Sequence, residues 1–572
     1  MELFIDDKPL DIKENETLQD LIIREGLDSK SLKTRPIAAK MAGEIFTLTY
    51  KPFPSDRKRP YRKSIRASKG HVGLVRYQDE QGRLVYERTL LFIYTLAVRN
   101  LFPKSKTFVC YSLGSGIFTL IAKYPEEPNR YDVTKEDAEA IKAEMRRIIE
   151  TDYPMKRERW SVEEAEELFR DEGQEDKVRL LEWRTFPYMD LYNIGSYHDY
   201  YYGEMLPSTG YANVFDIVYE GDGIVLMLPD PEDLDRPAVY KPMPKLKEAF
   251  RRKYEWVEIT NCSVVDDLND MVREGTIRDE IRICETLHEK EFSNVADRIV
   301  ARGAQAVMIA GPSSSGKTTS AHRLSIHLMM HGKRPVMLSL DDYYIDRELM
   351  KPEPDGSYDL ESLYALDVEL FKKDLKDMLD GKEVQIPTFD FKTQKPFYED
   401  KKKIKLGKED ILVIEGLHGL NPEMIPEGIE QSKVFKLYVS PLTTLNLDYH
   451  NRIRTTQIRQ LRRIVRDFET RGASVERTLS MWDSVRRGEE KWIFPYQEEA
   501  DAIMDTGLPY EPILLKRYIY PILMNVRPDN PYYEQVRGIV KFLNYFLEAN
   551  VEDEIPPTSI LREFIGGNTF YK

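Results

Sequence analysis

The stretch that decides the fold of the C-terminal part reads Ala306-Val307-Met308-Ile309-Ala310-Gly311-Pro312-Ser313-Ser314-Ser315-Gly316-Lys317-Thr318-Thr319. An apolar run leads directly into the pattern GxxxxGK[ST], the signature of a phosphate-binding P-loop. The glycines allow backbone N–H groups to turn toward phosphate oxygens, and the N-terminus of the following helix favours the same negative charge. The pattern predicts a strand, an ATP-binding loop over 311–319 and a helix over 320–330; a glycine turn with an incidental lysine is the alternative.

Three side chains around this loop are candidates for the chemistry. Lys317 is expected to reach the outer phosphates, and the Thr318 hydroxyl is expected to bind Mg²⁺. A second predicted strand, 336–340, ends in Asp341-Asp342. Because ligands sit at the carboxyl ends of parallel strands, we expect Asp341, one strand over from the P-loop, to face the γ-phosphate as general base and near the metal. A surface acidic pair is the alternative.

A third predicted strand, 410–414, ends in Glu415, which is expected to hold Mg²⁺ directly or through water. Further on, arginines crowd a helical stretch at positions Arg452, Arg454, Arg459, Arg462, Arg463, Arg466 and Arg471. Such a density of positive charge is typical of a lid that closes over phosphates. A solvated basic helix is the alternative interpretation.

The order of these motifs resembles the uridine kinase and phosphoribulokinase family over residues 306–503. The order is P-loop, LDDYY (340–344), IPTFDF (386–391), IEG (414–416), RRIVRD (462–467), RG (471–472) and ADAI (500–503). The resemblance implies ATP–Mg²⁺-dependent phosphorylation of a sugar hydroxyl. It implies catalytic roles for Asp341, Lys317, Arg463 and Arg466, and an ATP contact for Arg471.

The acceptor positions depart from uridine-cytidine kinases. Phe389 replaces a tyrosine, Gln394 replaces a histidine, an aspartate position falls near Ser362, and Met481 replaces a glutamine. Losing hydrogen-bonding partners weakens discrimination between substrates. We expect substrate contacts from Asp359, Phe389, Asp390, Gln394 and Arg463, with uridine as the leading acceptor. Another small sugar or polyol, or a nucleotide-gated protein that binds tRNA or the ribosome, remain alternatives.

The N-terminal half resembles two modules of threonyl-tRNA synthetases. Two short strands, a helix capped by Thr17 and two more strands resemble the TGS domain, which is a β-grasp module. The segments 97–103, 132–137 and 206–210 resemble, in that order, the second additional domain, which edits mischarged tRNA. The editing residues are absent: Arg88, Phe92, Tyr201 and Met205 stand at their positions. We therefore expect neither editing nor a zinc site. The tyrosines at 200–202 with His198 are read as a packed aromatic wall or, alternatively, as a base-stacking surface.

Length and composition fit several domains. The chain has 572 residues, 41% hydrophobic and 32% charged, with a net charge of −14. We expect a multidomain α/β protein divided into a TGS-like domain (1–60), a synthetase-like domain of α+β type (61–231), a helical connector (232–302), a P-loop kinase with a parallel sheet (303–525) and a helical extension (526–572).

Charge and cysteine usage bear on partners and location. The three cysteines are far apart, and the N-terminus has no apolar targeting segment, so we expect a cytoplasmic protein without a membrane partner. The segment 51–76 carries nine Lys/Arg and one Asp, which leaves weak RNA or tRNA contact and a solvated linker as alternatives. A homo-oligomer is left open.

Overall fold

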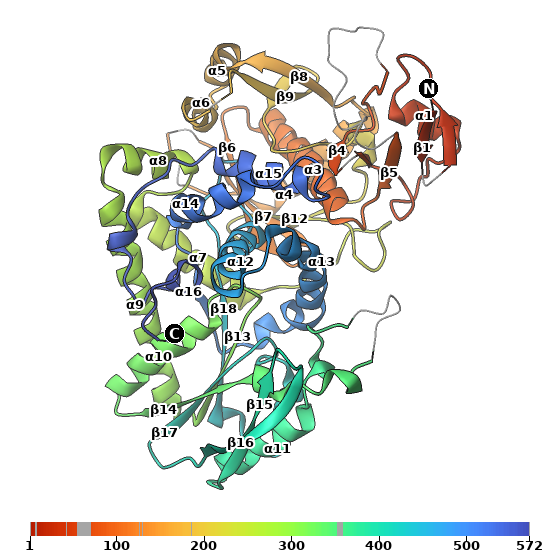
Figure 1. Cartoon of the computed structure of the whole chain (residues 1–572). Coiled ribbons are helices and arrows are strands. Elements are labelled where there is room, and N and C mark those ends of the chain that lie inside the picture. The colour runs from red at the N-terminus through yellow and green to blue at the C-terminus, as the bar shows by residue number, and fades with distance from the viewer. Residues whose placement is uncertain are drawn as a thin grey trace.

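The computed structural model describes residues 2–5, 8–41, 43–53, 70–124, 126–127, 130–184, 186–351 and 358–570. Figure 1 shows the N-terminal half in the upper part of the view and the strands that follow the P-loop in the lower part. Within the described ranges, no helix combines the length and apolar composition needed to cross a bilayer.

The first unit is a mixed sheet with one helix. Its elements are β1 (Glu2–Ile5), β2 (Lys8–Asp11), α1 (Leu18–Arg24), β3 (Ala38–Met41), β4 (Glu44–Phe46) and β5 (His71–Val75). The strand order is β2-β1-β5-β3-β4, with β1 and β5 parallel. Thr17 caps α1 through a reciprocal hydrogen bond with Asp20, as the sequence predicted. The central strand β5 lies beyond residue 60, so this unit extends past the boundary expected from the sequence.

The second unit contains two antiparallel sheets around a long buried helix, α3. Its elements are α3 (Glu80–Leu101), β6 (Lys106–Leu113), β7 (Gly116–Ala122), α4 (Lys135–Thr151), β8 (Lys156–Ser161), α5 (Val162–Asp171), α6 (Glu175–Glu182), β9 (Tyr188–Ile194), β10 (Tyr197–Asp199), β11 (Asp216–Tyr219) and β12 (Ile224–Met227). The sheets have the orders β11-β12-β7-β6 and β10-β9-β8. Tyr200 and Tyr201 are buried, which favours the packed aromatic wall over an exposed stacking surface.

The connector is helical, as expected, and leads into a five-stranded parallel sheet. The connector helices are α7 (Pro244–Thr260), α8 (Val265–Glu274) and α9 (Ile277–Arg302). The strands that follow are β13 (Ala306–Ala310), β14 (Arg334–Ser339), β15 (Val384–Asp390), β16 (Lys395–Ile404), β17 (Asp410–Glu415), β18 (Val434–Ser440) and β19 (Ala502–Asp505). The helices among and after these strands are α10 (Lys317–Met330), α11 (Val368–Leu379), α12 (Thr455–Arg471), α13 (Val475–Trp492), α14 (Glu511–Met524), α15 (Tyr533–Leu543) and α16 (Arg562–Ile565). Strands β15 and β16 form a separate antiparallel hairpin.

The parallel sheet has the order β14-β17-β13-β18-β19. Alternate residues of β13 point to opposite faces, where Val307 packs with α9, α10 and α14, and Met308 packs with α11. The order corrects one prediction. Asp341 follows β14, which is two strands from β13, because β17 lies between them. Strands β13 and β14 follow one another in the sequence but are not neighbours in this sheet, and the sequence alone did not reveal the crossover.

One continuous hydrophobic core joins segments far apart in the sequence. It contains Phe169 of α5, Leu268 of α8, Val413 of β17, Ile519 of α14 and Phe542 of α15, all of them buried. The chain after residue 526 therefore does not form a separate extension. It packs on the N-terminal half and then runs back to α10, where Phe570 stacks on His322 with ring centroids 5.2 Å apart (Figure 1).

Two helical glycines provide a test of this packing. A Cβ at Gly82 of α3 would lie 1.9 Å from the carbonyl oxygen of Arg76, whereas a Cβ at Gly538 of α15 would meet no atom within 4 Å. We expect Gly82→Ala to lower the free energy of unfolding by about 1–3 kcal/mol through overpacking. Gly538→Ala should raise it by about 0.5–1 kcal/mol. Thermal unfolding followed by calorimetry measures both, and equal melting temperatures for the two variants would contradict the packing of α3 against residue 76.

Candidate functional site

The P-loop connects β13 to α10, which begins at Lys317. Gly311 and Gly316 are required by close approaches: a Cβ would lie 2.1 Å from the Val439 carbonyl oxygen and 2.6 Å from Ile560 Cγ2, respectively. Gly316 also has φ +85°, a conformation that favours glycine. Lys317 Nζ donates a hydrogen bond to the Pro312 carbonyl at 3.3 Å. The loop therefore has the curled backbone that a phosphate cradle requires.

Two protein carboxylates accept hydrogen bonds from this loop and the helix that follows it. The N–H of Ser313 donates to Glu489 of α13 at 3.1 Å. At the other end, Thr319 donates to Glu563 of α16 from its N–H at 3.3 Å and from Oγ1 at 2.8 Å. These donors lie in the region where a P-loop binds phosphate oxygens. Neither glutamate was identified from the sequence, because both are brought in by helices that follow the loop at long range.

Asp341 and Glu415 lie at the carboxyl ends of β14 and β17. Ser339 Oγ donates to Glu415 Oε1 at 2.9 Å, and the two residues are register partners. The surrounding protein raises the pKa of Glu415 to about 7, with a contribution from the Asp341 carboxylate, while Lys317 opposes the rise. Asp341 keeps some solvent exposure, yet the protein around it also raises its pKa, against the opposing charges of Lys317 and Arg471. The structure thus brings Lys317 and both predicted carboxylates together.

A third carboxylate, Glu361, was missed by the sequence interpretation. Burial raises its pKa to about 7, and its electrostatic neighbours include Lys317, Asp341 and Arg463. Its Oε2 is buried without a hydrogen-bond partner among the described residues. Asp359, the acid chosen from the sequence, instead accepts a hydrogen bond from the Glu361 N–H at 3.1 Å. In the sequence, the one sign of Glu361 was that it is an acidic residue two positions after Asp359, the residue chosen as a substrate contact.

This charge distribution suits Mg²⁺. Glu361 and Glu415 are half-buried and Asp341 is exposed, yet the pKa values of all three carboxyl groups near Lys317 are raised; a divalent cation would stabilise their charged forms. In the described part of the chain, no three His, Cys, Asp or Glu side chains converge closely enough to hold a metal ion alone. Mg²⁺ is commonly held by one or two carboxylates, phosphates and water. Glu415 and Asp341, with the half-buried Thr318, are the side chains that would hold it.

The arginines of α12 and its approach have protein partners. Buried Arg459 pairs with Glu489 and donates to the Ser313 carbonyl at 2.8 Å; buried Arg462 pairs with Glu511 of α14. Protein carboxylates therefore already neutralise part of the positive charge from which the sequence predicted a lid over phosphates. Arg463 Nη1 donates to Ser313 Oγ at 2.9 Å. Ion pairs with Asp467 are made by the three arginines matched to the lid positions: Arg463, Arg466 and Arg471.

Aromatic side chains gather beside Asp341. The ring centroid of Tyr344 lies 5.3 Å from that of Phe389 and 6.2 Å from that of Phe391. Burial raises the pKa of Tyr344, with further contributions from Asp341 and Glu361. Phe389, one of the predicted substrate contacts, therefore lies near Asp341, through its contact with Tyr344.

Two other predicted substrate contacts lie at the end of the β15–β16 hairpin. The Asp390 carboxylate accepts hydrogen bonds from Lys392 N at 2.8 Å and Thr393 Oγ1 at 2.9 Å. Gln394 has φ +59° and accepts a hydrogen bond from Arg347. Both side chains are therefore engaged in the hairpin turn. Most of the basic segment 51–76, including its arginines and lysines from 57 to 69, lies outside the described residues.

Parts of this chain are similar to known proteins. Residues 306–509 match the model of the "Phosphoribulokinase / Uridine kinase family" and thus carry a domain of this family. The uridine kinase of Brevibacillus brevis is 29% identical over 202 residues, which cover 35% of this chain and 83% of that protein. The threonine–tRNA ligase of Symbiobacterium thermophilum is 34% identical over 145 residues, which cover 25% of this chain and 21% of the ligase. The structure titled "Structure of a Possible Uridine Kinase from Bacillus stearothermophilus" aligns with a TM-score of 0.27 and 18% identity, over 38% of this chain and 98% of that one.

The raised pKa of Glu415 predicts proton release when Mg²⁺–ATP binds. A bound cation lowers the pKa of the Glu415 carboxyl. At about pH 6.5 this carboxyl is largely protonated, so it releases a proton when the cation binds. Well above pH 7 it is already ionised and has no proton to release. Calorimetry in buffers of different ionisation enthalpy measures the number of protons. We expect Glu415→Gln to reduce the release, with Glu361 supplying the remainder. Glu409→Gln, at the exposed start of the same strand, is the control; release that is unchanged in Glu415→Gln would contradict the assignment.

The Glu563 carboxylate predicts competition with the nucleotide. Its negative charge lies at the first turn of α10, where it repels a phosphate. We expect Glu563→Gln to tighten binding of Mg²⁺–ATP about threefold to tenfold, which corresponds to about 1 kcal/mol. Titration calorimetry gives the Kd, and exposed Asp529→Asn is the matched control. Weaker binding in Glu563→Gln would show instead that this carboxylate supports the nucleotide site.

Proposed function

We propose that this chain is an ATP–Mg²⁺-dependent kinase that phosphorylates the 5′-hydroxyl of a nucleoside, with uridine as the leading acceptor. The observation that carries the proposal is the grouping of Lys317, Asp341 and Glu415 around the P-loop, where both carboxyl groups have raised pKa values. A raised pKa improves a carboxylate as a general base near neutral pH.

The roles of these residues follow from their charges. Asp341 orients the acceptor hydroxyl and takes its proton as the oxygen attacks the γ-phosphorus of ATP, and ADP leaves. Lys317 stabilises the negative charge that develops on the phosphoryl oxygens. When bound, Mg²⁺ supplies further charge neutralisation at the phosphates. Arg463, whose guanidinium contacts Ser313 of the loop, adds a positive charge at the same place.

The aromatic cluster of Tyr344, Phe389 and Phe391 supports an acceptor with a flat ring. Such a surface favours stacking of a nucleobase more than contact with a phosphorylated sugar, which requires cations. The match to the family of uridine kinases supports the same acceptor class. Asp390 and Gln394 are engaged in the hairpin turn, so the aromatic cluster carries the choice of acceptor. Kinases of another small sugar or polyol are the nearest alternatives.

The N-terminal half supports a second candidate, a nucleotide-gated protein that binds tRNA or the ribosome. The likeness to a threonine–tRNA ligase and the mixed sheet with one helix favour the synthetase-like and TGS-like reading of this half. A gated binding protein does not require a carboxylate with a raised pKa beside the loop, so Asp341 favours the kinase.

Asp341→Asn with Asp342→Asn as its matched control tests the kinase. Asp342 is adjacent but pairs with Lys402 at 2.8 Å. We expect Asp341→Asn to lower kcat by about 10²-fold to 10⁴-fold. Binding of Mg²⁺–ATP should weaken much less than kcat falls, since Glu415, Thr318 and the P-loop remain to hold the cation and the phosphates. The assay measures ADP formation with a panel of nucleosides, sugars and polyols. If no acceptor stimulates ATP consumption by the wild-type protein, the kinase proposal fails.

A further inference from the structure

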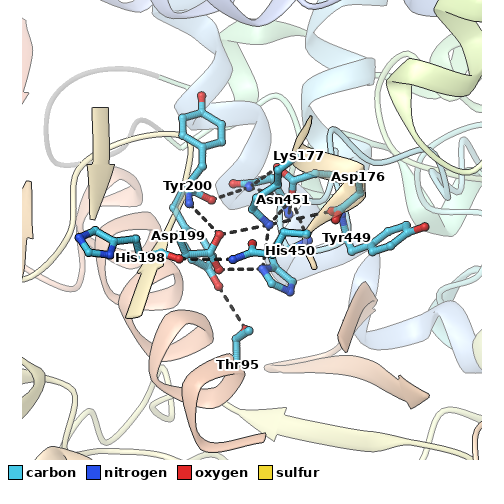
Figure 2. A network of polar contacts seen from close by, with 12 residues as sticks. Thr95, Asp176, Lys177, His198, Asp199, Tyr200, Tyr449, His450 and Asn451 are labelled. Atoms are coloured by element: carbon cyan, nitrogen blue, oxygen red, sulfur yellow. Dashed lines mark hydrogen bonds and ion pairs between the residues drawn. The ribbon is translucent and has the colours of Figure 1, made fainter. Parts of the chain in front are cut away.

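A buried cluster of charged side chains joins the N-terminal half to the P-loop domain (Figure 2). Lys177 of α6 is fully buried, and its Nζ lies 3.1 Å from Asp199 of β10 and 3.6 Å from Asp448, in the segment that precedes α12. His450 Nδ1 lies 2.7 Å from Asp199 Oδ2. Opposite charges in these surroundings interact strongly, so the cluster fixes the position of the 446–454 segment, defined here as residues 446 to 454.

Backbone and amide groups fix the same segment further. Asn451 Nδ2 donates to the Tyr200 carbonyl at 2.9 Å, and its Oδ1 accepts from the Tyr202 N–H at 3.0 Å. The N–H of Tyr449 donates to Asp176 at 2.9 Å. Figure 2 shows these groups from β10 and α6 converging on the turn that carries residues 449–451. The contacts specify both the position and the orientation of the turn.

Tyr201, one of the four positions where the synthetase resemblance places editing residues, contacts this segment. Its ring stacks on His450, with centroids 6.3 Å apart and an interplanar angle of 15°. Phe92, whose ring centroid lies 5.4 Å from that of Tyr201, and Met205 are buried. Arg88 is half-buried and donates to the Glu204 carbonyl at 3.2 Å. His450 therefore packs on one of the positions where the resemblance would place an editing residue.

Glu87 of α3 makes the contact nearest to α12. Its two carboxylate oxygens pair with Arg452 and Arg454, each at 2.8 Å. Burial alone would raise the pKa of Glu87, but the two guanidinium groups lower it to about 2, so the carboxylate stays charged. Arg454 is the N-cap residue of α12, and its N–H donates to Gln457 at 2.9 Å. Glu87 is thus bound to the residue from which the helix starts.

Helix α12 links the Glu87 contact to the P-loop, because arginines further along the helix contact Ser313. Arg459 and Arg463, one and two turns into the helix, donate to the carbonyl and to the hydroxyl of Ser313. Displacement of the helix start would shift both contacts, because a helix moves as a rigid element over such a length. Misplacing a catalytic group by about 1 Å can cost about 10²-fold in rate.

We propose that Glu87, in the N-terminal half, is a positioning residue for phosphoryl transfer, which it supports by holding the start of α12 through Arg452 and Arg454. The inference rests on the proposed kinase function. It assigns to the synthetase-like half a role in place of editing: this half binds the 446–454 segment of its own chain and sets the arginine helix against the P-loop.

Glu87→Gln tests the proposal, because it removes the charge and keeps the side-chain shape. We expect kcat to fall about tenfold and the KM for the acceptor to stay within about twofold, since the arginines act on the transferring phosphoryl group. Glu172→Gln is the matched control. It removes an ion pair of similar length, Arg99–Glu172 at 3.1 Å, that lies within the N-terminal half. This control should leave kcat unchanged.

A second pair of measurements separates positioning from general destabilisation. Arg454→Gln should reproduce part of the loss, and the double variant Glu87→Gln/Arg454→Gln should lose no more than Glu87→Gln alone, because Glu87→Gln already removes the Glu87–Arg454 pair. Hydrogen–deuterium exchange of residues 455–471 in the full-length protein should accelerate in Glu87→Gln and not in Glu172→Gln. This exchange readout needs no acceptor, so it tests the positioning role even if the kinase proposal fails.

Either of two results in the single variants would overturn the inference. One is wild-type kcat together with wild-type exchange over 455–471 in Glu87→Gln. The other is an equal loss in Glu172→Gln, which would mean that Glu87 contributes only to the stability of the N-terminal half. Losses that multiply in the double variant would show that Arg454 acts independently of Glu87, and would also contradict the proposal.

Discussion

A buried guanidinium group must have an anionic or carbonyl partner, and this requirement organises much of the structure around α12. Removing one partner of a buried ion pair leaves an uncompensated charge that costs several kcal/mol. Arg459 and Arg462 are buried, and their carboxylate partners come from α13 and α14. Arg452 and Arg454 take theirs from α3 of the N-terminal half. A single arginine-rich stretch therefore determines how helices from three parts of the chain are placed.

Carboxylates of α13 and α16 also contact the P-loop and the start of α10. Glu489 neutralises Arg459 and also accepts a hydrogen bond from Ser313, so one carboxylate links the arginine helix to the loop. Glu563 makes an equivalent contact with Thr319 from the C-terminal segment. Asp341, Glu361 and Glu415 remain around Lys317 with raised pKa values. The region thus combines hydrogen-bond donors suited to phosphate with carboxylates suited to a cation and to proton transfer.

The N-terminal half contributes to this arrangement through packing as well as charge. Apolar residues of α5, α6 and β9 share one core with the connector, the parallel sheet and the chain after residue 526, while most of its other buried residues form a core of their own. Lys177, which belongs to that half, is surrounded by carboxylates from both halves. Burial of a lysine at such a boundary is tolerated only when both partners are in place. The two halves are therefore expected to fold and act as one unit.

Local patterns in the sequence were enough to predict the P-loop, the capped helix after Thr17, the helical connector, and two strands followed closely by Asp341 and Glu415. These features depend on spacing and on nearby residues, and hydrophobic periodicity and hydrogen-bond chemistry reveal them directly. The position of β17 between β13 and β14, the raised pKa of Glu361 near Lys317, and the contacts of Glu87, Glu489 and Glu563 with α12 and the P-loop depend on tertiary structure. Those contacts join residues dozens to hundreds of positions apart, and their partners are fixed by burial and charge neutralisation, which no local pattern records.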